Sequence, residues 1–223
     1  MLKDNIAYLL KFAPKEAYID DLMDGHLYMN AAGYYHGLPG EQGDPLEASM
    51  APGACLYGYT RLPIYCMYAV RQSDIVNDCV QIPMHMIREF GCADGWIGIV
   101  QYDSFTRLVD GHIVDGGSIY AHGPISYGVP GPKLIREIFE GIPHNLVIKT
   151  PKYAYQREYR IIGSQPVECR LLPDEKHPGC KIEEYDHAEL DLGSSLADFS
   201  RKVSVSSLEE TQGGIMLKLP HRA

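Results

Sequence analysis

The sequence has no apolar run approaching the roughly 20 residues that a membrane-spanning helix needs, and no block rich in lysine and arginine. Its formal net charge is −9, from 29 acidic and 20 basic residues. Nucleic-acid binding needs a concentrated basic surface, and binding to a membrane surface needs a basic amphipathic helix. We therefore expect neither as a partner, although an acidic chain can still hold one basic pocket for a small phosphorylated ligand.

The sequence also lacks the features of a secreted, disulfide-bonded domain. Asp4 stands where a secretory signal would carry its basic region, and no small-residue cleavage site follows. The six cysteines form no Cys-x-x-Cys pair, and several lie in apolar, strand-like segments. Buried, reduced thiols are the simpler interpretation, and disulfides are the alternative. Together these features predict a cytoplasmic protein.

Internal repeats and low-complexity linkers are absent as well, so we expect residues 1–223 to form a single domain. Strand-like segments outnumber helical ones and do not alternate with them regularly. This pattern favours an α+β fold that is strand-rich, mostly antiparallel and has a few short helices. Residues 33–53, rich in glycine, proline and acids, predict a lid-like loop. Residues 188–223 predict a C-terminal extension of strand, short helix and strand.

Apolar periodicity and turn residues predict the individual elements. Strands are expected over residues 6–12, 26–30, 62–70, 96–102, 113–120, 146–149 and 155–162. Helices are expected over residues 15–24, 83–90 and 132–140. The helix over 132–140 has the clearest pattern, because its apolar face is followed by Gly141 and Pro143. The strands over 146–149 and 155–162 are expected to pair with each other.

The segment over residues 155–160, Tyr-Gln-Arg-Glu-Tyr-Arg, is the strongest candidate for chemistry. Alternate side chains of a strand share a face, so Gln156, Glu158 and Arg160 would stand together at intervals of about 7 Å. A carboxylate there could hold a sugar hydroxyl, while the amide orients an incoming nucleophile. The alternative is a solvated strand face with cross-strand ion pairs, and the spacing by itself favours that alternative.

Metal-binding and thiol chemistry have weaker support. His177 and Cys180 lie in one polar loop with His187 shortly after, but their spacing is not that of a closed zinc site. We therefore expect no metal. Cys66 or Cys79 could act as a nucleophile with one of the nine histidines, but Cys66 lies inside an apolar strand. An inert buried thiol is the favoured interpretation.

The chain is rich in tyrosine, with 16 residues. Tyr34 and Tyr35, together with Tyr57 and Tyr59, lie in or beside the loop over residues 33–53. Their rings could line a pocket by stacking on a flat ligand. The alternative is aromatic packing beneath a long loop.

The order of these features resembles a bacterial and phage family of domains of unknown function. The resemblance is carried by residues 9–12 (Leu-Leu-Lys-Phe), 18–25, 26–30, 43–47 (Gly-Asp-Pro-Leu-Glu), 95–102 and 155–161. It spans about the first three quarters of the chain. Three positions depart from the family pattern: Gly43 replaces an Asn, Leu46 an aromatic residue, and Gln156 the first acid of an acid-x-acid pair. Glu158 is the acid that is kept.

The chain is also similar, more remotely, to ADP-ribosyltransferases. These begin with a strand bearing His or Arg, continue with a helix ending in Gly, and finish with a strand bearing Gln/Glu-x-Glu. The corresponding residues here are Lys11, Gly25 and Gln156-Arg157-Glu158. Lys11 departs from the His or Arg of the pattern, and no clear Ser-Thr-Ser strand is present. The resemblance implies a split sheet.

For the chemistry, the resemblance implies NAD as the substrate. Glu158 would hold its ribose and stabilise the oxocarbenium-like transition state, and Gln156 would orient the acceptor. Lys11 would contact the dinucleotide, and Arg160, Tyr34 and Tyr35 complete the expected ligand-binding residues.

Three functional hypotheses follow. The first is an NAD-dependent ADP-ribosyltransferase-like enzyme, a toxin or an anti-phage defence effector, with a protein target. The second is a non-enzymatic module in phage–host conflict that binds a ligand or a protein, and the third is a nucleotide hydrolase. The first predicts that Lys11, Gln156 and Glu158 converge on one cleft with aromatic walls. The second predicts that Glu158 is exposed, or held in an ion pair far from any pocket. Exposed strand edges would also allow a homodimer.

Overall fold

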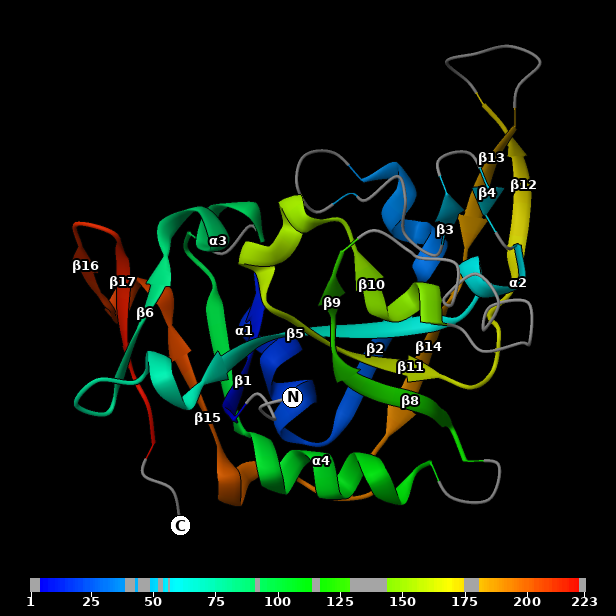
Figure 1. The fold of residues 1–223 in the computed structure, drawn as a ribbon. Coiled ribbons are helices and arrows are strands. Elements are labelled where there is room, and N and C mark those ends of the chain that lie inside the picture. Colours follow the sequence, from blue (N-terminus) through cyan, green and yellow to red (C-terminus); the bar gives the residue numbers. More distant parts are fainter. Residues whose placement is uncertain are drawn as a thin grey trace.

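The main feature of the fold is a sheet of eight strands (Figure 1). A computed structural model of the chain describes residues 5–38, 43, 49–51, 54–55, 57–90, 93–113, 117–128, 144–174 and 181–220. The main path of the sheet runs through β14 (His187–Asp191), β2 (His26–Ala31), β5 (Pro63–Arg71), β1 (Ile6–Ala13), β7 (Trp96–Gln101) and β15 (Ser200–Ser204). On the other edge of β5, β11 (Glu158–Gly163) pairs with β5 and with β8 (Ile119–Pro124). Every pairing in this sheet is antiparallel.

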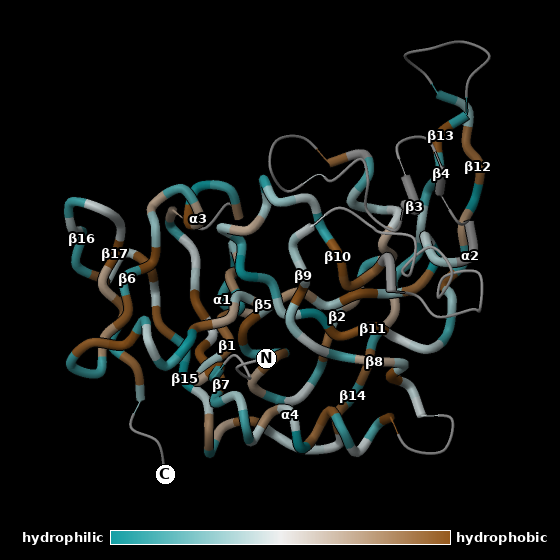
Figure 2. Tube along the Cα trace, in the orientation of Figure 1, coloured by the Kyte–Doolittle hydropathy of each residue, from teal (hydrophilic) through white to brown (hydrophobic). Residues whose placement is uncertain are grey.

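The sheet is covered on both faces near β1. Leu9 of β1 belongs to one apolar cluster, together with Phe105 and Val109 of α4 (Tyr102–Gly111). Leu10, the next residue of β1, belongs to a second cluster with Met86 of α3 (Met84–Glu89). In Figure 1, α4 and α3 accordingly lie on opposite sides of the sheet. The strands between them carry the apolar residues that Figure 2 colours brown.

The connection from β1 to β2 contains α1 (Glu16–Met23). Ile19 and Leu22 are three residues apart, so they share one helix face, and both are buried. Gly25 follows the helix with a φ of 91°, and its N–H donates to the carbonyl oxygen of Leu22. A Cβ at this position would lie 2.4 Å from the carbonyl oxygen of Ser194. Only glycine therefore fits this turn.

Smaller sheets extend the molecule at its two ends. At one end, β16 (Glu209–Thr211) and β17 (Gly214–Lys218) form an antiparallel sheet with β6 (Cys79–Pro83). At the other, β12 (Cys169–Pro173) and β13 (Lys181–Tyr185) form a hairpin that projects from the body (Figure 1). The remaining short elements are β3 (Ser49–Ala51), β4 (Ala54–Cys55), α2 (Tyr57–Thr60), β9 (Ser126–Tyr127), β10 (Ile148–Lys149), and the 3₁₀ helices η1 (Ala32–Gly37), η3 (Gln72–Asp74), η4 (His144–Val147), η5 (Pro151–Gln156), η6 (Ala197–Phe199) and η7 (Val205–Ser207).

The predicted fold class has to be corrected. The expected ADP-ribosyltransferase-like split sheet is wrong, because β5 joins β1, β2 and β11 into one connected eight-stranded sheet. What the described residues do have is a strand-rich structure with mostly antiparallel sheets and four α-helices. None of these helices is long and apolar enough to cross a membrane.

The expected strand over residues 155–162 is wrong in its first half. Residues 151–156 form η5, and Arg157 adopts a left-handed conformation with a φ of 42°, so β11 begins only at Glu158. Pro151 at the start of η5 presets a helical φ, and the ring of Tyr153 is buried beneath it. The expected pairing with residues 146–149 is also wrong, because β10 pairs in parallel with β9.

Other elements differ from the prediction in extent. The strand expected over 96–102 ends at Gln101, and α4 follows directly; its apolar residues Phe105 and Val109 lie four apart and were not recognised as a helical face. The strand expected over 113–120 begins only at Ile119. The described part of the tail, up to residue 220, holds four strands and two 3₁₀ helices. The predicted helix over 132–140 lies outside the described residues, as does most of the predicted 33–53 loop beyond η1.

Candidate active site

The site begins with an opening in the main sheet between β1 and β2. Both strands pair with the same edge of β5, but at different places. Leu10 of β1 pairs with Tyr68, and Asn30 of β2 pairs with Ile64. Residues 65–67 of β5, which lie between these two points, pair with neither β1 nor β2. There the Lys11 ammonium donates a hydrogen bond of 3.0 Å to the carbonyl oxygen of Cys66, which replaces a missing ladder bond.

A pocket of about 710 Å³ occupies this opening. Its walls come from β1, α1, β2, η1, β5, α3, β10, η5, β11, β13 and β14. The polar and charged lining residues are Lys11, Asp21, His26, Asn30, Cys66, Lys149, Gln156, Glu158, Arg160 and His187. The lining is otherwise largely apolar and aromatic, which is the usual character of a small-molecule pocket.

The Glu158 carboxylate is a buried charged group that lines the pocket. Its Oε1 atom accepts hydrogen bonds from Nε and Nη2 of Arg160, at 2.7 and 2.6 Å. Its Oε2 atom lies 2.7 Å from the Lys149 ammonium. Glu158 is 6 % exposed and Arg160 only 1 %. A buried carboxylate with two cationic partners is held in a single position, since each oxygen has its own donor.

This arrangement fixes the charge of Glu158. Burial raises the pKa of its carboxyl group, but the charges of Arg160 and Lys149 outweigh burial, and the Cys66 thiol and Lys149 also donate hydrogen bonds. The net result is a pKa far below the ordinary value. Glu158 is therefore ionised across the physiological range. It can stabilise positive charge or accept hydrogen bonds, but it cannot donate a proton.

The Cys66 thiol stays protonated beside this carboxylate. Burial, followed by the charge of Glu158, raises its pKa to about 12. A thiolate nucleophile is thus disfavoured, in keeping with the expectation that Cys66 is unreactive. Burial likewise raises the pKa of Tyr35 well above its ordinary value, with Cys66 adding to the effect, and the Tyr35 side chain is hydrogen-bonded to Asn30. Cys66 and Tyr35 therefore act as neutral hydrogen-bonding groups.

Gln156 reaches the pocket from η5 rather than from the strand. Its Oε1 atom accepts a hydrogen bond of 3.2 Å from the Lys149 ammonium. The left-handed turn at Arg157 separates it from Glu158 and directs both side chains into the pocket. Arg157 itself turns away and pairs with Asp74. Glu158 and Arg160 share a strand face as predicted, whereas Gln156 joins them through a turn.

Lys11 approaches from the other face of the sheet. By strand alternation it shares a face with Leu9 of the first cluster, whereas Glu158 lies on the face opposite Tyr159 of that cluster. The Lys11 ammonium also stands 4.0 Å from the centroid of the Tyr65 ring, a cation–π contact. The side chains of Lys11 and Glu158 line one pocket only because β1 and β2 diverge. Cys66 connects them, through its carbonyl oxygen to Lys11 and through its thiol to Glu158.

The far end of the pocket is aromatic. Phe12 stacks on Phe90 with ring centroids 5.9 Å apart, and its edge meets Tyr68 at 6.1 Å. Tyr34 and Tyr35 of η1 line another wall and meet edge to face. The pocket therefore combines one ionic region with flat apolar surfaces, on which a planar ring can stack.

All six residues predicted from the sequence line this pocket: Lys11, Tyr34, Tyr35, Gln156, Glu158 and Arg160. Their functional roles stay predictions. Tyr59, which the sequence also indicates as a pocket residue, does not line the pocket and packs against a third apolar cluster. Among the described residues no group of three or more His, Cys, Asp or Glu is placed to hold a metal ion, and His177 and Cys180 lie outside those residues.

Sequence reasoning missed Lys149. Its ammonium bonds both Glu158 and Gln156, and it lies 5.4 Å from the ring of Tyr153. The only signal in the sequence was its position at the end of a short apolar segment, which fits any surface lysine equally well. The sequence indicated Cys66 only as a possible nucleophile or a buried thiol, and not as a partner of Glu158.

Comparisons of the chain with protein-family models, with curated proteins and with solved structures gave no match.

Proposed function

We propose that the chain binds an NAD-like dinucleotide in this pocket and transfers its ADP-ribosyl group. One observation carries the proposal: residues that lie far apart in the sequence, Lys11, Tyr34, Gln156 and Glu158, line one pocket with an ionised carboxylate at its base. A dinucleotide combines flat rings with anionic phosphates. The aromatic walls suit the rings, and Lys11 and Lys149 offer positive charge to the phosphates.

In the proposed reaction the bond between the ribose C1′ and nicotinamide breaks, and its electron pair leaves with nicotinamide. A bond then forms between C1′ and the acceptor nucleophile, which loses its proton to solvent. Glu158 accepts a hydrogen bond from the ribose and stabilises the oxocarbenium-like charge at C1′. Because Arg160 and Lys149 share the charge of this carboxylate, its role is mainly to position the ribose. Gln156 orients the acceptor.

The first experiment is calorimetric titration with NAD, combined with mass-spectrometric detection of nicotinamide release. Wild-type protein is expected to bind NAD and release nicotinamide. Lys11→Met should weaken binding by roughly ten-fold, as expected for one lost charge-assisted contact. Its matched control is Lys218→Met, which removes an exposed lysine of β17 that does not line the pocket. Equal effects of both variants would show that NAD is not held in this pocket.

The catalytic part of the proposal is tested by Glu158→Gln. This change leaves Arg160 and Lys149 buried without their carboxylate, which costs about 3–5 kcal/mol of folding free energy, so thermal unfolding must be measured alongside. Gln156→Ala is the second variant, because it lowers the rate of release without breaking the ion pairs. A wild-type protein that neither binds nor consumes NAD refutes the proposal. Binding without release favours the non-enzymatic ligand-binding hypothesis.

A further inference from the structure

Exposed aromatic side chains gather at the mouth of the pocket. Tyr18, Tyr28 and Tyr34 are 51 %, 53 % and 44 % exposed. All three line the pocket, together with His187, although they come from α1, β2, η1 and β14. We call these four residues the aromatic rim. Single exposed aromatic residues are common, but a cluster of them often marks an interaction site, and tyrosine is enriched where proteins bind each other.

Two residues of the rim form a rigid platform. The Tyr28 ring stacks on the His187 ring with centroids 4.3 Å apart. The antiparallel ladder of β2 and β14 holds them in place, since Tyr28 is registered with Glu189, and His187 with Asn30. Preorganised rings lose little conformational freedom when a partner binds.

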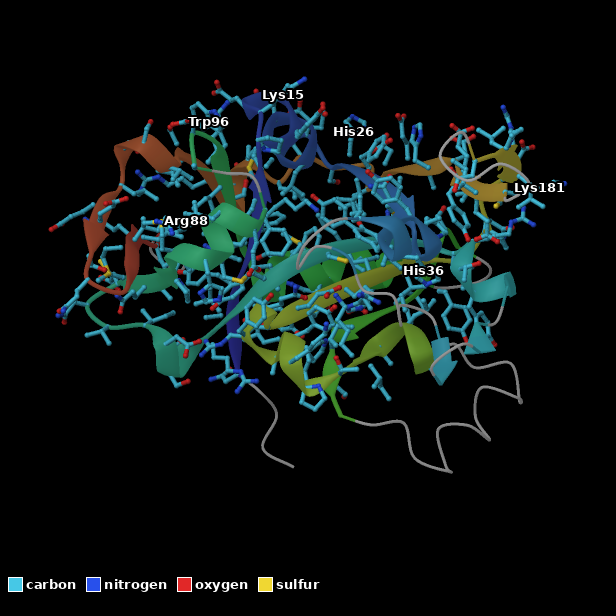
Figure 3. The ribbon with its side chains drawn as sticks, turned by 90° about the horizontal axis from the view of Figure 1, so that it is seen from above. Lys15, His26, His36, Arg88, Trp96 and Lys181 are labelled. Carbon is cyan, nitrogen blue, oxygen red and sulfur yellow. The ribbon has the colours of Figure 1, made fainter. Side chains whose placement is uncertain are left out.

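The surroundings of the rim are acidic. Asp186 and Glu189 flank the His187 ring of the rim: an Asp186 oxygen lies 3.2 Å from its Nδ1 atom, and a Glu189 oxygen lies 3.6 Å from its Nε2 atom. Burial and the nearby Tyr34, Asp186 and Glu189 raise the pKa of Tyr28, in keeping with this arrangement. Asp21 lines the same pocket, and Asp191 lies on β14 opposite His26. Figure 3 shows His26 along the same side of the molecule as Lys15.

The rim already holds one cation of its own chain. The Lys15 ammonium lies 5.7 Å from the centroid of the Tyr18 ring. Lysine and arginine are the side chains that aromatic faces and nearby carboxylates attract together. The chemistry of the rim, within a chain of net charge −9, therefore fits a cationic occupant rather than an anionic one.

We propose that the aromatic rim is a docking surface for a basic segment of a partner protein, with arginine or lysine side chains seated on Tyr28 and Tyr18 and paired with Glu189 and Asp21. The proposal extends the proposed function, because a target docked here would present its acceptor at the mouth of the pocket. Docking itself needs no nucleotide. A protein that fails to dock the segment can therefore be distinguished from one that fails to bind NAD.

The test is fluorescence anisotropy, without nucleotide, with a short labelled peptide in which arginine alternates with glycine. Wild-type protein is expected to bind this peptide. It is expected not to bind a peptide with glutamate in place of arginine. Tyr28→Ala should raise the dissociation constant by roughly five-fold, and Glu189→Gln by roughly two- to five-fold. The matched controls are Tyr120→Ala and Glu209→Gln. They remove a similarly exposed tyrosine and an exposed acid outside the pocket and should leave binding unchanged.

Two outcomes overturn the proposal. If the controls weaken binding as much as the rim variants do, the peptide responds to net charge and not to this surface. If free arginine competes at the same concentration as the peptide, the rim is a site for a small cation and not for a polypeptide. Far-ultraviolet circular dichroism of each variant shows whether a loss of binding reflects a loss of folding.

Discussion

Glu158 illustrates how one carboxylate can serve both the fold and the pocket. Its two oxygens are held by Arg160 and Lys149, and Arg160 also donates to the carbonyl oxygen of Leu146 at 2.6 Å. Removal of one member leaves a buried charge without its partner, which is costly. The same contacts keep the carboxylate ionised and immobile at the base of the pocket. An ion pair and a functional role are thus compatible at this position.

The low pKa of Glu158 predicts a stability that depends on pH. The unfolded chain binds this proton at an ordinary pKa of about 4.3, and the folded chain only at a much lower pH. The stabilisation is therefore complete above about pH 5 and is lost as the pH falls towards the folded pKa, with a slope of up to about 1.4 kcal/mol per pH unit. Denaturant unfolding between about pH 6 and pH 3 should show this slope in wild type. Glu158→Gln should lack it, whereas the exposed Glu209→Gln should keep it.

At the scale of residues, the sequence could indicate candidate site residues but not the residues that contact them in the fold. Gln156, Glu158 and Arg160 stand close together in the chain, so their spacing suggested that they act together. Lys149 joins them only through the fold, since η5 brings it back beside Glu158. No periodicity encodes such a contact.

At the scale of elements, the turn at Arg157 determines how the site is built. A left-handed residue ends η5 and lets Gln156 and Glu158 both reach the pocket. Its side chain pairs with Asp74, and its carbonyl oxygen accepts a hydrogen bond of 2.8 Å from the N–H of Ala69. Arginine, unlike glycine or asparagine, rarely adopts this conformation unless its surroundings enforce it.

Substitutions at Arg157 separate the backbone from the ion pair. Arg157→Asn and Arg157→Val both remove the contact with Asp74, but only asparagine tolerates a left-handed conformation. We expect the valine variant to be less stable than the asparagine variant by about 1–2 kcal/mol, measured by denaturant unfolding. Equal stabilities would mean that the turn can rearrange at no cost.

The sequence predicted strands well where a single signal, an apolar run of strand length, dominated the segment. β1, β5 and β7 are almost wholly buried, and their apolar runs have strand length. The segment over 155–162 also has strand-like composition, but the buried Tyr153 and the turn at Arg157 override that preference. The split sheet was wrong because motif order does not specify which strand edges meet.

At the scale of the whole molecule, the C-terminal strand completes a core that begins with β1. Ile215, Leu217 and Leu219 are almost fully buried in the second cluster. β17 pairs with β6, and the Tyr8 hydroxyl of β1 donates to the carbonyl oxygen of Pro220 at 2.6 Å. The last strand and the first therefore stabilise each other.

A chain that ends at Leu208 should lose most of its stability. It lacks three buried aliphatic side chains, which together contribute about 5–9 kcal/mol, comparable to the total stability of a domain. Thermal unfolding and dye binding to exposed apolar surface would measure the loss. A chain that ends at Pro220 keeps every one of these contacts and should unfold like wild type. If the shorter chain melts at the same temperature, β17 is dispensable.

The opening between β1 and β2 also has a consequence for synthesis. Lys11 and Cys66 meet across this opening, but Glu158 leaves the ribosome 147 residues after Lys11, which corresponds to about 7–30 s of translation. During that interval the nascent chain can pair β1 with β5, while the edge of β5 that β11 will occupy stays unpaired. The pocket is therefore assembled late, and a nascent chain that has not yet reached Glu158 lacks the carboxylate that lines it. Any activity of the pocket would thus begin only after most of the chain has been made.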